Sequence, residues 1–419
     1  MCTLLQFSVS NFRSIHKTRT LSLVPQSIQD EPKGAVVISD KNKFLTAAAI
    51  YGANSSGKSN VVKALADMTS TVLSSVKIND NDPLDQDPFL LSENSAKEPT
   101  SYEVIYLNNN RDKIRYGFEY TDSEIVSEWL FVTRSNKRSE ETLFVRDSEG
   151  IAVNDTLFAE GVDNEERTND NRLFISLVAQ LGGPISKSVI SFFQSGFRVI
   201  SGLSSLGYNG FTEQLIHEDT QEAKEAMQFF NNLKLGFEKV QTESHIVEKQ
   251  GIKGVVQKND IVPFSVHNVY DNNGNVIDTR RFEFYDRESA GTEKLFKLAG
   301  PLFDTLKNGN LLVVDELDAK MHPLISQQII RIFADPKTNP NHAQLLFTTH
   351  DTNLLSCHLL RRDQIWFTEK DACEATDLYN MMQIVFPDGS KPRSDGNLER
   401  NYIKGRYGAI PYFHPDTNE

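Results

Sequence analysis

The chain has 419 residues, of which 39% are hydrophobic, and a formal net charge of −13. That length allows one to three domains with a large core. No apolar run approaches the roughly 20 residues of a membrane span, so we expect a cytoplasmic protein without a membrane partner. The acidic balance argues against a surface that binds nucleic acid throughout, because duplex binding requires Lys and Arg to neutralise phosphates. Direct nucleic-acid binding at a local basic groove stays open.

Two minor features point to ordinary surface and core roles. The three cysteines, Cys2, Cys357 and Cys373, have no metal-ligand spacing, which predicts buried or idle thiols. The densest basic stretch, residues 134–138, is followed at once by two glutamates and is interpreted as a solvated turn.

The first elements in chain order are a strand and a strand–loop–helix unit. Residues 4–9 alternate like a half-buried strand, and residues 47–51 form a short apolar run like a fully buried one. A Gly-rich loop follows, and then apolar residues recur at steps of four, three and four, which is typical of one helix face: Val61, Leu65, Met68 and Val72.

The middle of the chain changes character twice. Residues 102–107 and 114–120 alternate around a turn, and further strands are expected near 129–133 and 142–146, which together predict an antiparallel lobe at about 100–155. Residues 172–236 are expected to be mostly helical, including a polar helix at 220–235, without the sustained heptads of coiled-coil arms. Strand-like segments return from 262 to 285, and from 289 onward strands and helices alternate as in a parallel sheet covered by helices.

These elements predict an α/β fold whose main domain, the head, is formed by two separate stretches of the chain. We expect the head to comprise residues 1–160 and 255–419, interrupted by a mainly helical insertion at 160–255. The functional motifs all fall within the head.

The Gly-rich loop has the pattern of a phosphate-binding loop. Its glycines let backbone N–H groups curl around phosphates, Lys58 can reach the β- and γ-phosphates of ATP, and Ser59 can offer a hydroxyl to Mg²⁺. The expected binding residues are Gly52, Ala53, Asn54, Ser55, Ser56, Gly57, Lys58, Ser59 and Asn60.

Two later strands end in candidate catalytic residues. Residues 311–314 form an apolar strand that ends in Asp315, a candidate ligand of hydrated Mg²⁺, and Glu316, a candidate general base for the attacking water. Residues 344–349 form a second strand that ends at His350, which could contact the γ-phosphate or that water. We expect the two strands to be neighbours.

A second anion site is expected at Ser289, Gly291 and Thr292, directly before a helix with apolar residues at 295, 298, 302 and 306 and a kink at Gly300-Pro301. On its own, a serine at this place is equally well explained as a helix cap. One chain already has a phosphate loop, however, so a second anion site is explained if it clasps the nucleotide of another subunit.

These four elements, in this order, resemble the ABC-type ATPase superfamily: Walker A, signature, Walker B with a D-loop at Leu317-Asp318, and the switch histidine. The more than 200 residues between Lys58 and Ser289 resemble the RecF, SMC and OLD branch and differ from a transporter motor, the third and disfavoured interpretation. In that branch the segment 7–15 forms the first strands, and the resemblance implies that Arg13 approaches the phosphates, with a salt-bridged surface arginine as the alternative.

A narrower resemblance spans nearly the whole chain. The head motifs, together with His322-Pro323, Thr349-His-Asp351 and the ending 401–409, are similar to the stand-alone AAA-type ABC ATPases of bacterial abortive-infection and phage-defence operons, of the RloA/AbiL type and the AriA subunit of PARIS systems. The resemblance departs in two places. About 70 residues follow His350, too few for the Toprim nuclease domain of OLD relatives. The Q-loop glutamine is unassigned between Gln86 and Gln180.

The resemblance implies a nucleotide-dependent scaffold and switch in anti-phage defence. ATP and Mg²⁺ would bind in a head-to-tail dimer, with a higher oligomer and a phage-derived trigger left open, and the switch would control a separate effector, a Toprim-type nuclease. The insertion and the ending near 402–412 are the expected docking surfaces, with packing of the ending on the head as the alternative. The second candidate function is a RecF-like ATPase that clamps DNA in repair.

Overall fold

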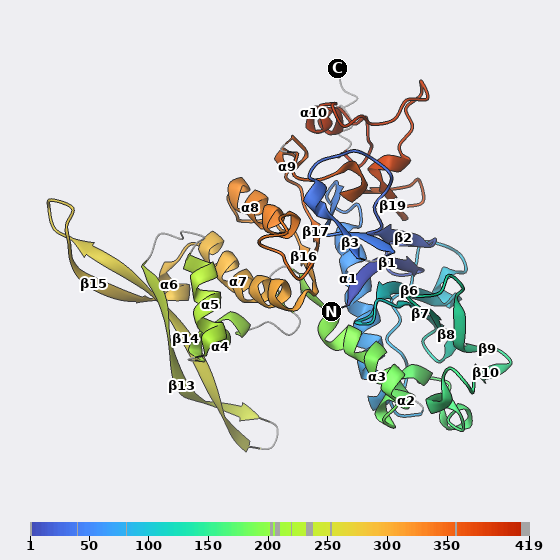
Figure 1. Ribbon diagram of the computed structural model, residues 1–419. Coiled ribbons are helices and arrows are strands. Elements are labelled where there is room, and N and C mark those ends of the chain that lie inside the picture. The colour runs from blue at the N-terminus through green and yellow to red at the C-terminus, as the bar shows by residue number, and fades with distance from the viewer. Residues whose placement is uncertain are drawn as a thin grey trace.

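Two sheets and a projecting arm make up the molecule. The computed structural model describes residues 2–39, 41–80, 82–201, 204–205, 210–218, 220–231, 238–251, 254–356 and 358–411. Within them the chain forms two seven-stranded sheets in the body and a three-stranded arm (Figure 1). Cys357 and the expected docking residue Tyr412 lie outside the described residues.

The first sheet is antiparallel and contains the predicted lobe. Its strand order is β10-β9-β8-β7-β6-β1-β2. Its side chains alternate between core and surface, so that Tyr102, Val104 and Tyr106 of one strand all point inward. The predicted lobe is therefore confirmed, and the N-terminal strands extend it. The strands are β1 (Thr3–Ser10), β2 (Arg19–Ser22), β6 (Thr100–Leu107), β7 (Lys113–Tyr120), β8 (Ile125–Thr133), β9 (Glu141–Asp147) and β10 (Gly150–Val153).

The second sheet has a parallel centre and carries the motif strands. Its order is β12-β11-β16-β17-β5-β18-β19, and the five strands from β11 to β18 run parallel. The histidine strand β17 lies beside the carboxylate strand β16, as predicted. The strands are β5 (Ala47–Gly52), β11 (Phe197–Ser201), β12 (Ser204–Ser205), β16 (Leu311–Asp315), β17 (Gln344–Thr348), β18 (Ile365–Lys370) and β19 (Thr376–Asn380).

Helices cover both faces of this sheet, which is why its strands are continuous apolar runs. Leu311 and Val313 pack with α1 (Lys58–Ser74) and the antiparallel sheet, whereas Leu312 and Val314 pack into a second core. Helix α1 therefore lies between the two sheets. The second core is shared with helices α7 (Ala290–Asn308), α8 (Pro323–Ala334), α9 (Asn353–Ser356) and α10 (Leu398–Ile403).

The insertion has the helices that were predicted and, in addition, strands that were not. The segment supplies β11 to the parallel sheet and β13 (Lys239–Gly251) to the arm. Phe197 and Val199 alternate into the core because β11 pairs with β16, a partner more than 100 residues away that the local sequence does not reveal. The helices of this region are α2 (Phe174–Gln180), α3 (Pro184–Ser191), α4 (Phe211–His217) and α5 (Gln221–Asn231), with a π-helical turn at Phe192–Gly196.

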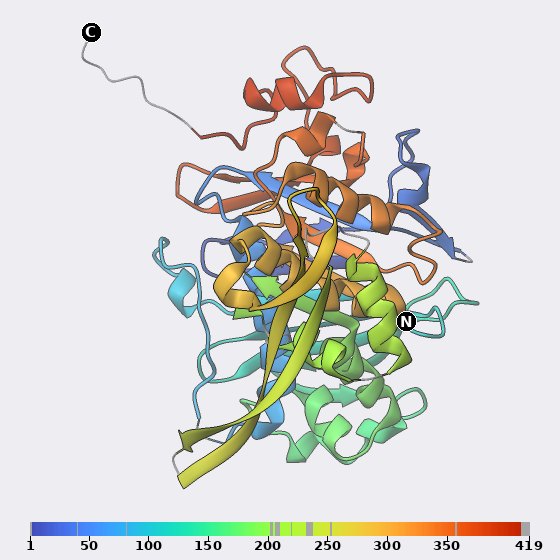
Figure 2. The same ribbon diagram turned by 90° about the vertical axis from the view of Figure 1, so that its left-hand side faces the viewer.

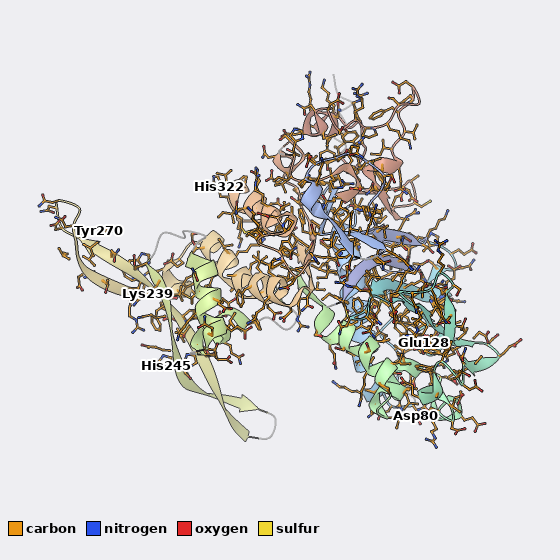
Figure 3. All side chains as sticks on the ribbon, viewed as in Figure 1. Asp80, Glu128, Lys239, His245, Tyr270 and His322 are labelled. Atoms are coloured by element: carbon orange, nitrogen blue, oxygen red, sulfur yellow. The ribbon has the colours of Figure 1, made fainter. Side chains whose placement is uncertain are left out.

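The arm consists of two β-ribbons that share one strand. β13 pairs with β14 (Gly254–Tyr270), β15 (Val276–Glu283) pairs with the other end of β14, and only residues 264–266 have partners on both sides. Helix α6 (Phe284–Arg287) then leads into α7. The arm stands to the left of the body in Figure 1 and crosses in front of it in Figure 2. Tyr270 lies toward one end and is 57% exposed (Figure 3).

The ending of the chain packs on the head, which is the alternative that the sequence left open. Tyr402, Tyr407 and Ala409 are buried in the second core, and the Tyr379 hydroxyl donates to the Tyr407 carbonyl oxygen at 2.8 Å. Tyr402 is therefore no docking surface. The remaining short elements are β3 (Val36–Ser39) and β4 (Asn42–Leu45). Among the described residues, no helix has the length and apolar character needed to cross a bilayer.

Candidate nucleotide site

The phosphate-binding loop connects β5 to α1 and requires glycine at two places. Gly57 has φ 106°, and a Cβ there would lie 2.1 Å from Thr376 Oγ1. A Cβ at Gly52 would lie 2.5 Å from Thr368 Oγ1. Both glycines therefore allow β18 and β19 to approach the loop backbone closely.

Lys58 is held at the centre of this cradle. Its side chain is almost fully buried, and its Nζ donates to the carbonyl oxygens of Gly52 and Ala53 at 2.8 and 2.9 Å. Burial lowers the pKa of Lys58 to about 8, against the opposing attraction of Asp315 and Glu316. The ammonium group is thus preorganised in the loop and lies in the field of the carboxylates at the end of β16.

A hydrogen-bonded support under the loop was not predicted. Thr376 Oγ1 donates to the Ser56 carbonyl oxygen at 3.0 Å and lies 2.8 Å from Ser14 Oγ, which accepts from Asn60 Nδ2 at 2.6 Å. The Ser56 and Thr368 hydroxyls are 2.6 Å apart. These partners come from the N-terminal loop and from strands more than 300 residues away, so no signal in the local sequence identifies them.

The carboxylate pair sits at the end of β16, next to the end of β17. Asp315 is 8% exposed, and its Oδ1 accepts from the Thr348 hydroxyl at 2.6 Å. The Glu316 N–H donates to the same Thr348 oxygen at 2.7 Å, and Glu316 adopts a left-handed φ of 53°. Thr348 therefore orients both acidic residues, a role that the sequence did not reveal.

His350 completes the edge formed by the carboxyl ends of β5, β16 and β17. Its backbone N–H donates to Asp318 of the D-loop at 3.3 Å. Partial desolvation, together with the charge of Lys58, lowers the pKa of its imidazole, and the nearby carboxylates oppose this shift. The imidazole is therefore neutral at pH 7, with one nitrogen able to accept a hydrogen bond.

The signature residues lie at the start of α7. The Ser289 hydroxyl caps the helix by accepting from the Thr292 N–H at 3.2 Å, so the helix-cap interpretation describes its contacts within one chain. A Cβ on Gly291 would lie 2.6 Å from the carbonyl oxygen of Lys320, which places the motif against the turn that follows the D-loop. In the described part of the chain, no hydrogen bond connects Ser289 with the phosphate loop.

Three other candidates are Arg13 and the two glutamines considered for the Q-loop. Arg13 forms an ion pair with Asp87 at 2.6 Å, as in the alternative interpretation of this residue. The Gln86 amide donates to Glu98, Thr100 and Tyr120 within the antiparallel lobe. Gln180 is exposed at the end of α2. These positions identify neither Gln86 nor Gln180 as the Q-loop glutamine.

The arrangement fits a nucleotide with Mg²⁺. The candidate metal ligands Ser59 and Asp315 offer a hydroxyl and a carboxylate, the oxygen donors that Mg²⁺ takes from P-loop proteins alongside phosphates. Positive φ at Ser55 and Gly57 lets the backbone curl as a phosphate-binding loop requires. The site can therefore place phosphates, a metal ion and a water beside Glu316.

The fold and this site define a P-loop ATPase of the α/β class. The chain belongs to the AAA domain family described as putative AbiEii toxin, Type IV TA system, whose model matches residues 47–356. A comparison with curated proteins gave no significant match.

Two solved structures illustrate what the chain is similar to. One is the SMC head bound to the C-winged helix domain of ScpA, with a TM-score of 0.41, 12% identity, and coverage of 90% of this chain and 97% of that one. The other is the recombination mediator protein RecF with ATP, with a TM-score of 0.39, 11% identity, and coverage of 90% and 98%.

Proposed function

We propose that the chain hydrolyses ATP at a site that two copies complete head to tail. Gly52–Ser59, Asp315, Glu316 and His350 would come from one copy, and Ser289, Gly291 and Thr292 from the other. The observation that carries this proposal is that, among the described residues, Ser289 makes no hydrogen bond to the phosphate loop and instead caps its own helix. The carboxyl ends of three neighbouring strands gather the catalytic groups, whereas the anion-binding start of α7 lies against the turn that follows the D-loop.

Each residue then has a definite task. Lys58 binds the β- and γ-phosphates, and Ser59 and Asp315 hold Mg²⁺, which when bound neutralises phosphate charge. Glu316 orients the attacking water and accepts its proton. The neutral imidazole of His350 hydrogen-bonds near the γ-phosphate, so its position depends on whether that phosphate is present.

We further propose that the ATPase is a switch for a separate effector, a Toprim-type nuclease, in cytoplasmic anti-phage defence. Two points support this. The family description names a toxin of a toxin–antitoxin system, which supports a role in controlled toxicity. A shared nucleotide site also couples ATP binding and hydrolysis to the association of two copies, which is the change that such a switch requires.

Mixing two inactive variants tests the shared site. Ser289→Arg places a long cation where the partner's γ-phosphate would bind, and Lys58→Ala removes the phosphate lysine, so each alone should lose hydrolysis. Their mixture should recover activity, because a mixed dimer contains one intact site. Glu316→Gln provides the reference for loss of the base, with hydrolysis reduced by about 10²- to 10⁴-fold.

The matched control is Ser289→Arg mixed with the double variant Lys58→Ala/Ser289→Arg, which offers no intact signature. That mixture should stay inactive. If Ser289→Arg and Lys58→Ala exchange subunits but recover no activity at any ratio, the site is not shared.

A further inference from the structure

The first turns of α7 rest directly on the segment that carries Glu316. Lys294 is five residues past Ser289, and its Nζ donates to the Glu316 carbonyl oxygen at 2.6 Å. Gly291 packs so closely on the Lys320 carbonyl that a Cβ would lie 2.6 Å from its oxygen. The signature helix and the turn after β16 are thus joined at two points within one chain.

The backbone of Glu316 is held in an uncommon conformation by a small set of hydrogen bonds. Its φ of 53° is in the left-handed region, which is unfavourable for a residue with a Cβ. Its N–H is fixed by Thr348, and its carbonyl accepts from Ala319 N–H at 3.1 Å and from Lys294. Of these partners, Lys294 alone belongs to the signature helix, since the others come from the same turn or from β17.

We propose that Lys294 is a positioning residue that holds Glu316 in place for hydrolysis and links it to the signature of the same chain. The proposal rests on the proposed function of Glu316 as the base. Lys294 reaches the carbonyl from a half-buried site that faces Asp315, Glu316 and Asp318. Because a displacement of about 1 Å is enough to slow an oriented reaction by about 10²-fold, a single backbone contact can govern the rate.

The contact also explains how the partner could influence the base. Ser289 begins α7, and Glu288, just before it, is held by His267 of the arm at 3.0 Å. A nucleotide of the partner that engages Ser289 therefore acts on a helix that is tethered at its start and bonded to Glu316 five residues further on. Binding of the partner's nucleotide at Ser289 can therefore change the position of Glu316 through α7 and Lys294.

Lys294→Met tests this role, because it keeps the length of the side chain and removes the donor. We expect kcat for ATP hydrolysis to fall by about 10- to 10²-fold with an unchanged KM, since ATP binding does not use this contact. Lys294→Arg, which can still donate to a carbonyl, should recover part of the rate. Lys307→Met is the matched control, because Lys307 lies at the other end of α7 and pairs with Glu222.

A double variant separates positioning from an independent role. If Lys294 acts through Glu316, adding Lys294→Met to Glu316→Gln should leave the residual rate unchanged. Multiplied losses in the double variant would overturn the proposal, and so would a wild-type kcat in Lys294→Met. An inactive wild-type protein would instead refute the proposed function, so the two failures are distinguishable.

Discussion

Lys58 combines burial with a task that requires positive charge. Because burial lowers its pKa to about 8, from 10.5, the protein loses the ammonium form as pH rises through about 8. ATP affinity should therefore fall above that pH, approaching about tenfold per pH unit if the neutral amine does not bind. The measurement is the Kd for ATP between pH 7 and 9.5 in the Glu316→Gln background, where hydrolysis does not interfere.

Lys58→Arg is the control for this pH effect, because a guanidinium stays charged throughout that range. Whatever affinity the arginine variant retains should be independent of pH. The same alkaline loss in Lys58→Arg would show that another group titrates.

The residues at the catalytic edge could be predicted to different degrees. The loop Gly52–Ser59, the Asp315-Glu316 pair and His350 follow apolar strands, so the sequence indicated both their chemistry and their placement at one sheet edge; their catalytic roles stay predictions. Thr348 and Thr376 could not be identified. A threonine acts as a support only when distant strands meet, and one sequence contains no record of that pairing.

Helix α7 shows how one element depends on another for its continuity. Pro301 lies inside it and has no N–H, so the Lys297 carbonyl loses its helical partner. The Thr212 hydroxyl of α4 donates to that carbonyl at 3.3 Å and accepts from the Gly300 N–H at 3.1 Å. A Cβ at Gly300 would lie 2.6 Å from the same hydroxyl oxygen, so glycine permits the approach.

Thr212→Val should weaken α7 at this break. It keeps the shape of the side chain but removes the hydroxyl that bonds the Lys297 carbonyl and the buried Gly300 N–H. The loss of a hydrogen-bond partner at a buried group costs about 1–3 kcal/mol. Native-state hydrogen exchange should show a corresponding loss of protection in α7 around Gly300. Thr212→Ser, which retains the hydroxyl, should exchange like the wild type. Unchanged protection in the valine variant would mean that the hydroxyl does not support the helix.

Helices and strands could be predicted where the hydrophobic pattern of the segment itself indicates them. Alternating strands such as β6 and the apolar face of α1 could be read directly, because each pattern has its own period. The starts of α2 and α3 could not, because neither has a capping residue of its own: Glu128 of β8 accepts from the Phe174 and Ile175 N–H groups, and Glu160 accepts from Ile185 and Ser186. A cap supplied from a distant segment cannot be recognised at the helix itself, and of these two helices only α3 has a local start signal, Pro184 at its first turn.

At the scale of the whole molecule, the arm is the largest departure from expectation. Strand-like segments were predicted at 262–285, where β14 and β15 lie, but β13 was assigned to the helical insertion. The pairing of β13 with β14 sets its structure. The sequence did indicate that an insertion separates the phosphate loop from the signature. The structure adds that this insertion returns to the head through α6 and reaches the signature at Glu288, so the arm and the proposed shared site are connected.

The proposed effector gives the last prediction. If ATP-dependent pairing of two copies governs a separate nuclease, co-expression with the product of an adjacent gene should give a complex that survives purification. Toxicity in cells should then require the ATPase cycle. Lys58→Ala should abolish it by preventing ATP binding, and Glu316→Gln should alter it by holding the ATP-bound state. The matched control is Lys307→Met, which leaves the site untouched.

The proposal fails if the ATPase alone confers the full phenotype with every neighbouring gene deleted. It also fails if the isolated chain cleaves nucleic acid, because no separate effector is then needed.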